Sequence, residues 1–121
     1  MAKLGYARTN TYYHDLTSQL IALRKENVVK IFIDKDHSSN SPQPELEKAL
    51  NKLQEGDTLI IYSLDRLNRN IKRLLRFFRL LANRNIHFIS ILEKIDTTNM
   101  SENMIIKALE TLSELNLTIN K

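Results

Sequence analysis

The apolar run at residues 58–62, Thr58-Leu59-Ile60-Ile61-Tyr62, constrains the fold of this chain more than any other segment. It is nearly continuous, without the polar–apolar alternation of a strand that has one face in water. A run of this kind is typical of a strand buried on both faces of a parallel sheet. We therefore expect a sheet that is flanked by helices.

Strand-like and helix-like segments alternate along the rest of the chain. β-Branched and aromatic residues gather in the strand-like segments, and apolar residues at helical spacing mark the helices. Strands are expected at 3–7, 28–34, 58–62 and 86–92, and helices at 16–27, 44–53, 67–83 and from a cap at Ser101 onward. The helix at 67–83 is expected to be the longest. This alternation predicts an α/β fold: a single domain over residues 1–121 with a mainly parallel (mixed) β-sheet of four to five strands flanked by helices.

Composition excludes several classes of protein. The 121 residues contain no cysteine, which excludes disulfide scaffolds, zinc–cysteine sites and thiol catalysis. No apolar run approaches the ~18 residues of a membrane span, and the first residues lack the apolar core of a signal peptide, so we expect a cytoplasmic protein without membrane contact. The histidines lack metal-ligand spacing and there is no glycine-rich nucleotide loop, so neither a metal nor a cofactor is expected. The net charge of +4 permits nucleic acid as a partner.

Arginines dominate the segment that follows the strand at 58–62. On a helical projection, four of them fall within one arc of roughly 80°: Arg66, Arg69, Arg73 and Arg76. A solvated helix face usually mixes charges of both signs, whereas the helix expected at 67–83 contains no acidic residue, and the one acid of the stretch, Asp65, precedes it. A run of arginines suits phosphate groups, so the stripe favours an anionic partner over a merely solvated surface. Arg8, just after the first strand, is a weaker signal, because an ordinary surface arginine would look the same.

Several short motifs occur in the order of a known family. They are Gly5-Tyr6-Ala7-Arg8, Pro44-Glu45-Leu46, Glu55-Gly56-Asp57-Thr58-Leu59 and Asp65-Arg66-Leu67-Asn68-Arg69. With them, nearly the whole chain resembles the N-terminal catalytic domain of the serine recombinases, the resolvases and DNA invertases. The resemblance implies a resolvase-like fold and metal-free DNA strand exchange, in which a serine hydroxyl attacks a DNA phosphate and arginines neutralise the developing charge. It also implies a separate C-terminal DNA-reading segment, which we expect to be absent from residues 1–121.

The resemblance carries functional residues over by position. The positions in or near the family's active site are occupied here by Tyr6, Arg8, Asn10, Gln19, Asp34, Asp65, Arg66 and Arg69. For DNA binding, the arginine stripe and the resemblance together indicate Arg8, Arg66, Arg69, Arg73 and Arg76. DNA is the implied partner, bound weakly or non-specifically by this chain alone. The resemblance further implies a homodimer, or a heteromer with an active recombinase, formed through the C-terminal helix.

Two departures from the family bear on catalysis. Asn10 stands where the family has its nucleophilic serine, and Gln43 stands where it has an arginine. Asparagine has no hydroxyl, and phosphoryl transfer needs a nucleophile and charge stabilisation together. We therefore expect a catalytically inactive recombinase-like domain, not an enzyme by itself, which acts in site-specific DNA recombination by binding DNA or a partner. Two alternatives remain: an active recombinase with Thr11 or Tyr12 as substitute nucleophile or with an introduced change at Asn10, and a protein-interaction module without a DNA role.

Overall fold

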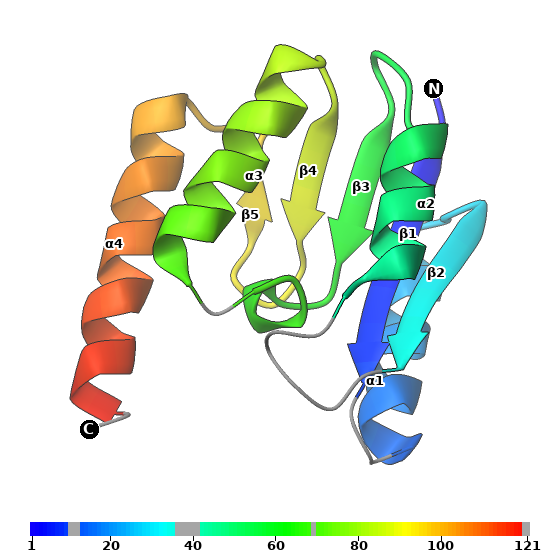
Figure 1. Cartoon of the computed structure of the whole chain (residues 1–121), viewed down its shortest axis with the longest axis horizontal. Coiled ribbons are helices and arrows are strands. Elements are labelled where there is room, and N and C mark those ends of the chain that lie inside the picture. Colours follow the sequence, from blue (N-terminus) through cyan, green and yellow to red (C-terminus); the bar gives the residue numbers. More distant parts are fainter. Residues whose placement is uncertain (10–12, 36–41, 69, 120–121) are drawn as a thin grey trace.

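The structure of the chain is a computed structural model. It describes residues 1–9, 13–35, 42–68 and 70–119, and for 13–15, 102 and 112–119 it describes the backbone alone. Within these residues, five strands form one sheet in the order β2-β1-β3-β4-β5 (Figure 1). The strands are β1 (Lys3–Thr9), β2 (Lys30–Lys35), β3 (Thr58–Ile61), β4 (His87–Ser90) and β5 (Ile95–Asp96). The first four are parallel, and β5 runs antiparallel to β4.

Helices cover both faces of this sheet. The described ranges contain α1 (Tyr13–Lys25), α2 (Pro44–Lys52), α3 (Ile71–Asn83), α4 (Glu102–Ile119) and a short 3₁₀ helix, η1 (Leu64–Arg66). Figure 1 shows α1 behind the sheet, α2 and α3 in front of it, and α4 beside α3. The single α/β domain with a mainly parallel sheet, predicted from the alternation of segments, is confirmed.

Strand β3 explains why the sheet needs helices on both sides. Leu59 and Ile61 are fully buried in the core under α2 and α3, while Ile60 is fully buried in the smaller core under α1. The larger core contains an aromatic contact between α3 and the sheet, in which the rings of Phe78 and Phe88 lie 4.8 Å apart between centroids. Burial of apolar side chains from alternate strand positions therefore fixes the position of the helices on each face.

The helix predicted at 67–83 begins later than expected. Helix α3 starts at Ile71, and the residues before it form the separate 3₁₀ helix η1 and a connecting segment. Two asparagines interrupt the helix: Asn68 Oδ1 accepts from the Asn70 N–H at 2.8 Å, and Asn70 Oδ1 accepts from the Arg73 N–H at 3.2 Å. The second bond makes Asn70 the N-cap of α3. Short polar side chains that bond the local backbone compete with helix, so the apolar periodicity alone placed the start wrongly.

Helix α4 begins where the sequence predicts. Ser101 Oγ accepts from the Met104 N–H at 3.2 Å, which satisfies one of the amides of the first turn. With 18 residues, α4 is longer than the 13-residue α3, so the prediction that α3 would be the longest helix is wrong for the described chain. Over the same residues, no helix combines the length and apolar character needed to cross a membrane.

The strand order creates one position where the chain changes direction across the sheet. From β1 the chain moves outward to β2, returns past β1 to β3, and then continues to β4. In open parallel sheets of this order, the connections that leave the carboxyl ends of the two strands at the reversal diverge and leave space for a ligand. The reversal here lies between β1 and β3, so their carboxyl ends mark the place for a functional site.

Candidate functional site

Residues from the ends of β1 and β2 and from η1, which follows β3, lie at the carboxyl edge of the sheet, around the reversal between β1 and β3. Arg8 lies near the end of β1 and is in register with Asp34 of β2. The 3₁₀ helix η1, which carries Asp65 and Arg66, follows soon after β3 and contacts β1. The fold therefore brings together four of the residues that the sequence singles out, although they come from positions far apart in the chain.

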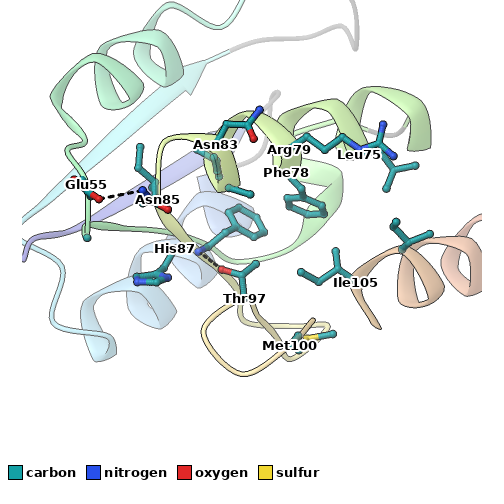
Figure 2. A pocket seen from close by; sticks show the side chains of 16 residues that line it. Glu55, Leu75, Phe78, Arg79, Asn83, Asn85, His87, Thr97, Met100 and Ile105 are labelled. Atoms are coloured by element: carbon teal, nitrogen blue, oxygen red, sulfur yellow. Dashed lines mark hydrogen bonds between the residues drawn. The ribbon is translucent and has the colours of Figure 1, made fainter. Parts of the chain in front are cut away.

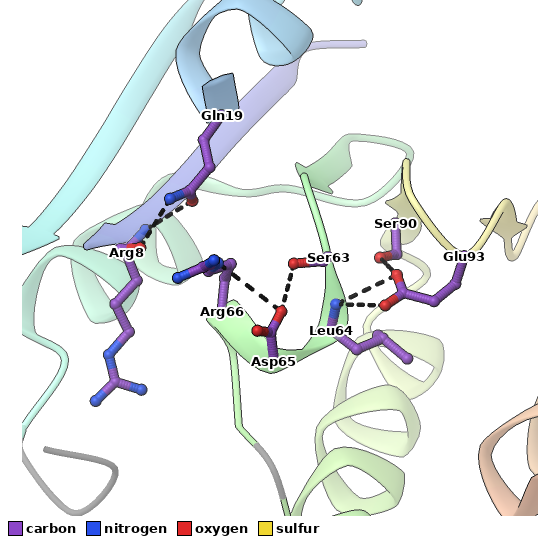
Figure 3. Close-up of polar contacts among 8 residues, drawn as sticks. All are labelled: Arg8, Gln19, Ser63, Leu64, Asp65, Arg66, Ser90 and Glu93. Carbon is purple, nitrogen blue, oxygen red and sulfur yellow. Dashed lines mark hydrogen bonds and ion pairs between the residues drawn. The ribbon is translucent and has the colours of Figure 1, made fainter. Parts of the chain in front are cut away.

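Gln19 of α1 fixes the backbone of Arg8. Its fully buried side chain accepts from the Arg8 N–H at 3.1 Å and donates to the Arg8 carbonyl at 2.9 Å (Figure 3). This exchange of two bonds imitates a paired residue of a neighbouring strand. Gln19 thus holds the main chain from which the Arg8 side chain projects.

Asp34 is a buried acceptor that joins two elements. Its carboxylate, 4% exposed as a residue, accepts from the Tyr6 hydroxyl at 2.9 Å and from the amides of Glu45 and Leu46 at 3.0 and 3.2 Å. The two amides belong to the first turn of α2, so Asp34, a residue of strand β2, caps this helix with its side chain. Burial raises the pKa of the Tyr6 hydroxyl well above its ordinary value, the hydrogen bond from Gln43 opposes this rise, and the Asp34 carboxylate adds to it.

Gln43 links the start of α2 to the segment after η1. Its amide nitrogen donates to the Tyr6 hydroxyl oxygen at 3.0 Å and to the Leu67 carbonyl at 3.2 Å. The neutral amide therefore occupies the position between β1 and η1 where the sequence resemblance leads one to expect an arginine. It contributes hydrogen bonds there, but no positive charge.

The acidic and basic residues of η1 interact with each other. The Ser63 hydroxyl donates to Asp65, and Arg66 Nε lies 3.8 Å from Asp65 Oδ1, with 23% of the Arg66 side chain exposed. Figure 3 shows the Arg66 side chain directed from η1 toward the end of β1, where Arg8 projects. Arg8 itself is only 8% exposed. The two guanidinium groups at this edge are therefore largely covered.

Glu93, which the sequence analysis did not single out, holds η1 from the other side. It lies in the turn after β4, and both of its carboxylate oxygens face the Leu64 N–H, at 3.3 and 3.2 Å (Figure 3). The buried Ser90 hydroxyl donates to the same carboxylate. Its signal in the sequence is its place as an acid directly after the strand expected at 86–92.

Helix α3 carries a group of four exposed cations. Lys72, Arg73, Arg76 and Arg79 are exposed, while Leu74 and Phe78 of the same helix are buried. Because α3 begins at Ile71, Arg66 of η1 does not share a helix face with Arg73 and Arg76, contrary to the expectation of one stripe on one helix. Asn10 and Arg69 lie outside the described residues.

The two arginines make this edge of the sheet suited to the binding of a phosphate group. In the part of the chain that the structure describes, no three histidine, aspartate or glutamate side chains gather in a way that would hold a metal ion. Guanidinium groups bind phosphate oxygens through charge-assisted hydrogen bonds. Thr9, the hydroxyl residue next to Arg8, is buried, at 7% exposed.

A cavity of about 630 Å³ lies at the opposite edge of the sheet. Figure 2 shows it between the end of α3, the start of β4 and the first turns of α4. Its walls are mostly apolar, and include Phe78, Met100 and Ile105. Two of its polar side chains bond neighbouring groups: Asn85 donates to Glu55 at 3.0 Å, and Thr97 accepts from a backbone amide at 2.8 Å. It contains none of the residues that the sequence singles out for DNA.

Comparison with protein families gives a match over almost the whole chain. The family model described as "Resolvase, N terminal domain" matches residues 3–121. The transposon Tn917 resolvase of Enterococcus faecalis is 34% identical over 111 residues, which are 92% of this chain and 60% of the relative. The DNA-invertase hin of Salmonella typhimurium is 33% identical over 115 residues, which are 95% of this chain and 60% of the relative. The chain thus spans about 60% of the length of these relatives.

Solved structures show the same fold. The N-terminal catalytic domain of TP901-1 integrase superposes with a TM-score of 0.74 at 22% identity, over 100% of both chains. A resolvase family site-specific recombinase from Streptococcus pneumoniae gives a TM-score of 0.67 at 17% identity, over 98% of this chain and 89% of that one. At this level of identity, the comparison concerns the fold.

Proposed function

The chain belongs to the resolvase N-terminal domain family, and we propose that it binds the phosphates of duplex DNA in site-specific recombination without cleaving them. The observation that carries this proposal is the exposed basic face of α3. This helix follows η1 in the chain, at the carboxyl edge of the sheet where Arg8 and Arg66 lie. The relatives named above are a resolvase and a DNA invertase, which supports DNA as the ligand.

The basic face of α3 supplies the first contact with DNA. Helix α3 contains no acidic residue, so the attraction of its cations to phosphate is not offset within the helix. Lys72, Arg73 and Arg76 are exposed on its surface. Arg66 and Arg8 are more deeply placed and contact a phosphate only when the DNA lies close to the sheet edge.

Loss of cleavage follows from the residues at two positions. Asn10 offers no hydroxyl at the position of the family's nucleophile, and Gln43 offers no charge at the position of its arginine. Gln43 is engaged with the Tyr6 hydroxyl and the Leu67 carbonyl, which supports a structural use of this position. Without a nucleophile, arginine charges that would stabilise a transition state instead stabilise bound DNA.

We further propose that the chain pairs with a second copy or with an active recombinase through α4. Ile105 and Leu109 of α4 are buried against the core, whereas Met104 is 53% exposed. Sedimentation of the chain alone, and of its mixture with a full-length recombinase, tests this pairing. A monomer in both samples at high concentration contradicts it.

The DNA proposal is tested by fluorescence anisotropy of a labelled duplex across a salt series. Three phosphate contacts from α3 predict a slope of log K against log salt of about −3, at roughly −0.9 for each phosphate neutralised. The double variant Arg73→Ala with Arg76→Ala should lose about two units of this slope. The control removes two exposed charges from α1, on the other face of the sheet, with Arg24→Ala and Lys25→Ala. Equal losses in both double variants contradict a specific role for α3.

Cleavage is tested separately, by searching for covalent protein–DNA adducts with denaturing gels and mass spectrometry. The unchanged chain should form none, and the double variant Asn10→Ser with Gln43→Arg restores the two groups that the family uses. An adduct in the unchanged chain overturns the proposal and identifies an active recombinase, and the modified peptide reveals whether Thr11 or Tyr12 carries the DNA.

A further inference from the structure

We propose that Glu93 is a positioning residue for Arg66, holding η1 so that the Arg66 guanidinium is pre-ordered for a DNA phosphate. The inference rests on the proposed DNA binding and deepens it, because it names a residue that sets the geometry of the contact without making it. Glu93 lies in the turn between β4 and β5, outside the motifs that carry the resemblance and outside the arginine stripe.

The first step is the contact between Glu93 and the start of η1. Leu64 is the first residue of η1, and its N–H points to the Glu93 carboxylate, with oxygens at 3.3 and 3.2 Å. The residue before η1, Ser63, gives no side-chain cap, and its hydroxyl donates to Asp65 instead. A carboxylate from 29 residues away therefore takes the place of the local N-cap.

The second step is the rigidity of the turn that carries Glu93. The β3–β4 ladder continues beyond the strand ends, since Ile91 N–H donates to the Ile61 carbonyl at 3.0 Å and Leu92 N–H to the Tyr62 carbonyl at 2.8 Å. The fully buried Ser90 adds its hydroxyl to the Glu93 carboxylate. The carboxylate is thus fixed relative to the central strands of the sheet.

The third step is that η1 is held at both ends. Glu93 accepts from Leu64 at the start, and Gln43 donates to the Leu67 carbonyl just after the end, at 3.2 Å. Arg66 lies between these two anchors. An arginine that is already ordered loses less conformational entropy on binding, so fixing its backbone raises affinity without any new contact.

Anisotropy of the full chain with a labelled duplex at low salt tests the proposal through a double-mutant cycle. Glu93→Ala should weaken binding about three- to tenfold, the range expected when one long side chain must be ordered on binding. In an Arg66→Ala background, the same change should have no further effect. Glu93→Gln, which keeps an acceptor oxygen for the Leu64 N–H, should restore most of the loss. Glu55→Ala is the matched control, because it removes an exposed carboxylate at the opposite edge of the sheet.

Several outcomes overturn the proposal. Tighter binding by both Glu93 variants would mean that the carboxylate only repels DNA, and an undiminished loss in the Arg66→Ala background would mean that Glu93 acts elsewhere. A measurement without DNA separates this inference from the proposed function: NMR of the Leu64 amide and the Arg66 Nε–H in the Glu93→Ala chain. Faster exchange of the amide and a broadened Arg66 signal support positioning even if the unchanged chain binds no DNA, in which case only the proposed function fails. Unchanged signals refute positioning.

Discussion

Replacing Asp34 with alanine tests the claim that this residue holds the sheet and α2 together. The change removes an acceptor of three hydrogen bonds, from the Tyr6 hydroxyl and the amides of Glu45 and Leu46, at a residue that is 4% exposed. Hydrogen bonds to a charged acceptor contribute about 1.5–3 kcal/mol each, and loss of a helix cap costs about 1 kcal/mol. The bonds share one carboxylate, so we expect a total loss of about 3–5 kcal/mol in the free energy of unfolding.

This loss is a large fraction of the stability of a small domain, which is about 5–15 kcal/mol. Urea unfolding followed by circular dichroism measures it. Asp96→Ala is the control, because the Asp96 carboxylate, at the end of β5, accepts local bonds from the exposed residues Thr98 and Asn99. Asp34→Asn keeps one acceptor oxygen and should fall between the two. An ordinary substitution costs about 1 kcal/mol in the free energy of unfolding. If the free energies of unfolding of Asp34→Ala and Asp96→Ala differ by less than about this amount, the Asp34 carboxylate does not hold α2.

Three further predictions concern stability. Two backbone N–H bonds lower the pKa of Asp57, so its contribution to the free energy of unfolding is complete above the ordinary aspartate pKa and is lost as the pH falls through the lowered pKa. Urea midpoints measured between about pH 2 and 5 should therefore depend less on pH in Asp57→Asn than in the unchanged chain. An equal pH dependence in both would contradict this. Burial raises the pKa of Tyr6, so its contribution to the free energy of unfolding is complete below the ordinary tyrosine pKa of about 10 and is lost as the pH rises through the raised pKa. In an absorbance titration, Tyr6 should therefore ionise only when the chain unfolds. Ionisation of Tyr6 in the folded chain near the ordinary pKa would refute its burial. Arg84 Nη2 donates to the Leu50 and Leu53 carbonyls at 3.0 and 2.8 Å, and Arg84→Ala should cost about 1–3 kcal/mol in urea unfolding, whereas Arg84→Lys should recover part of it.

The fold was predictable because its signals are local. The apolar run at 58–62 is buried on both faces, with Ile60 on one side and Leu59 and Ile61 on the other, as a parallel sheet requires. The start of α3 was not predicted, because Leu67 and Ile71 keep a helical spacing while Asn68 and Asn70 bond the backbone between them. Apolar periodicity reports which residues are buried, and it does not register this competition.

The candidate site was predictable in its members but not in their roles. Sequence resemblance indicated Gln19 and Asp34, yet their bonds to the Arg8 backbone and to the first turn of α2 depend on the assembled sheet. Glu93 was missed because its partner, Leu64, is 29 residues away and offers only a backbone amide, which no side-chain pattern reveals. The catalytic assignments of Arg8, Asp65 and Arg66 stay predictions.

The central position of β1 has a consequence for how the chain acquires its structure during synthesis. The strand made first pairs with β2 on one side and with β3 on the other, so its hydrogen bonds are complete only when residues up to Ile61 have left the ribosome. Until then the backbone N–H and C=O groups on the β3 side of β1 have no partner strand, and such an unpaired edge makes a nascent chain prone to misassembly. The Ala2 N–H also donates to Asp57 at 2.8 Å, so the N-terminal end of β1 is tied down by the same late segment. Slowing translation between residues 35 and 58 should therefore lower the yield of folded chain more than slowing it after residue 61.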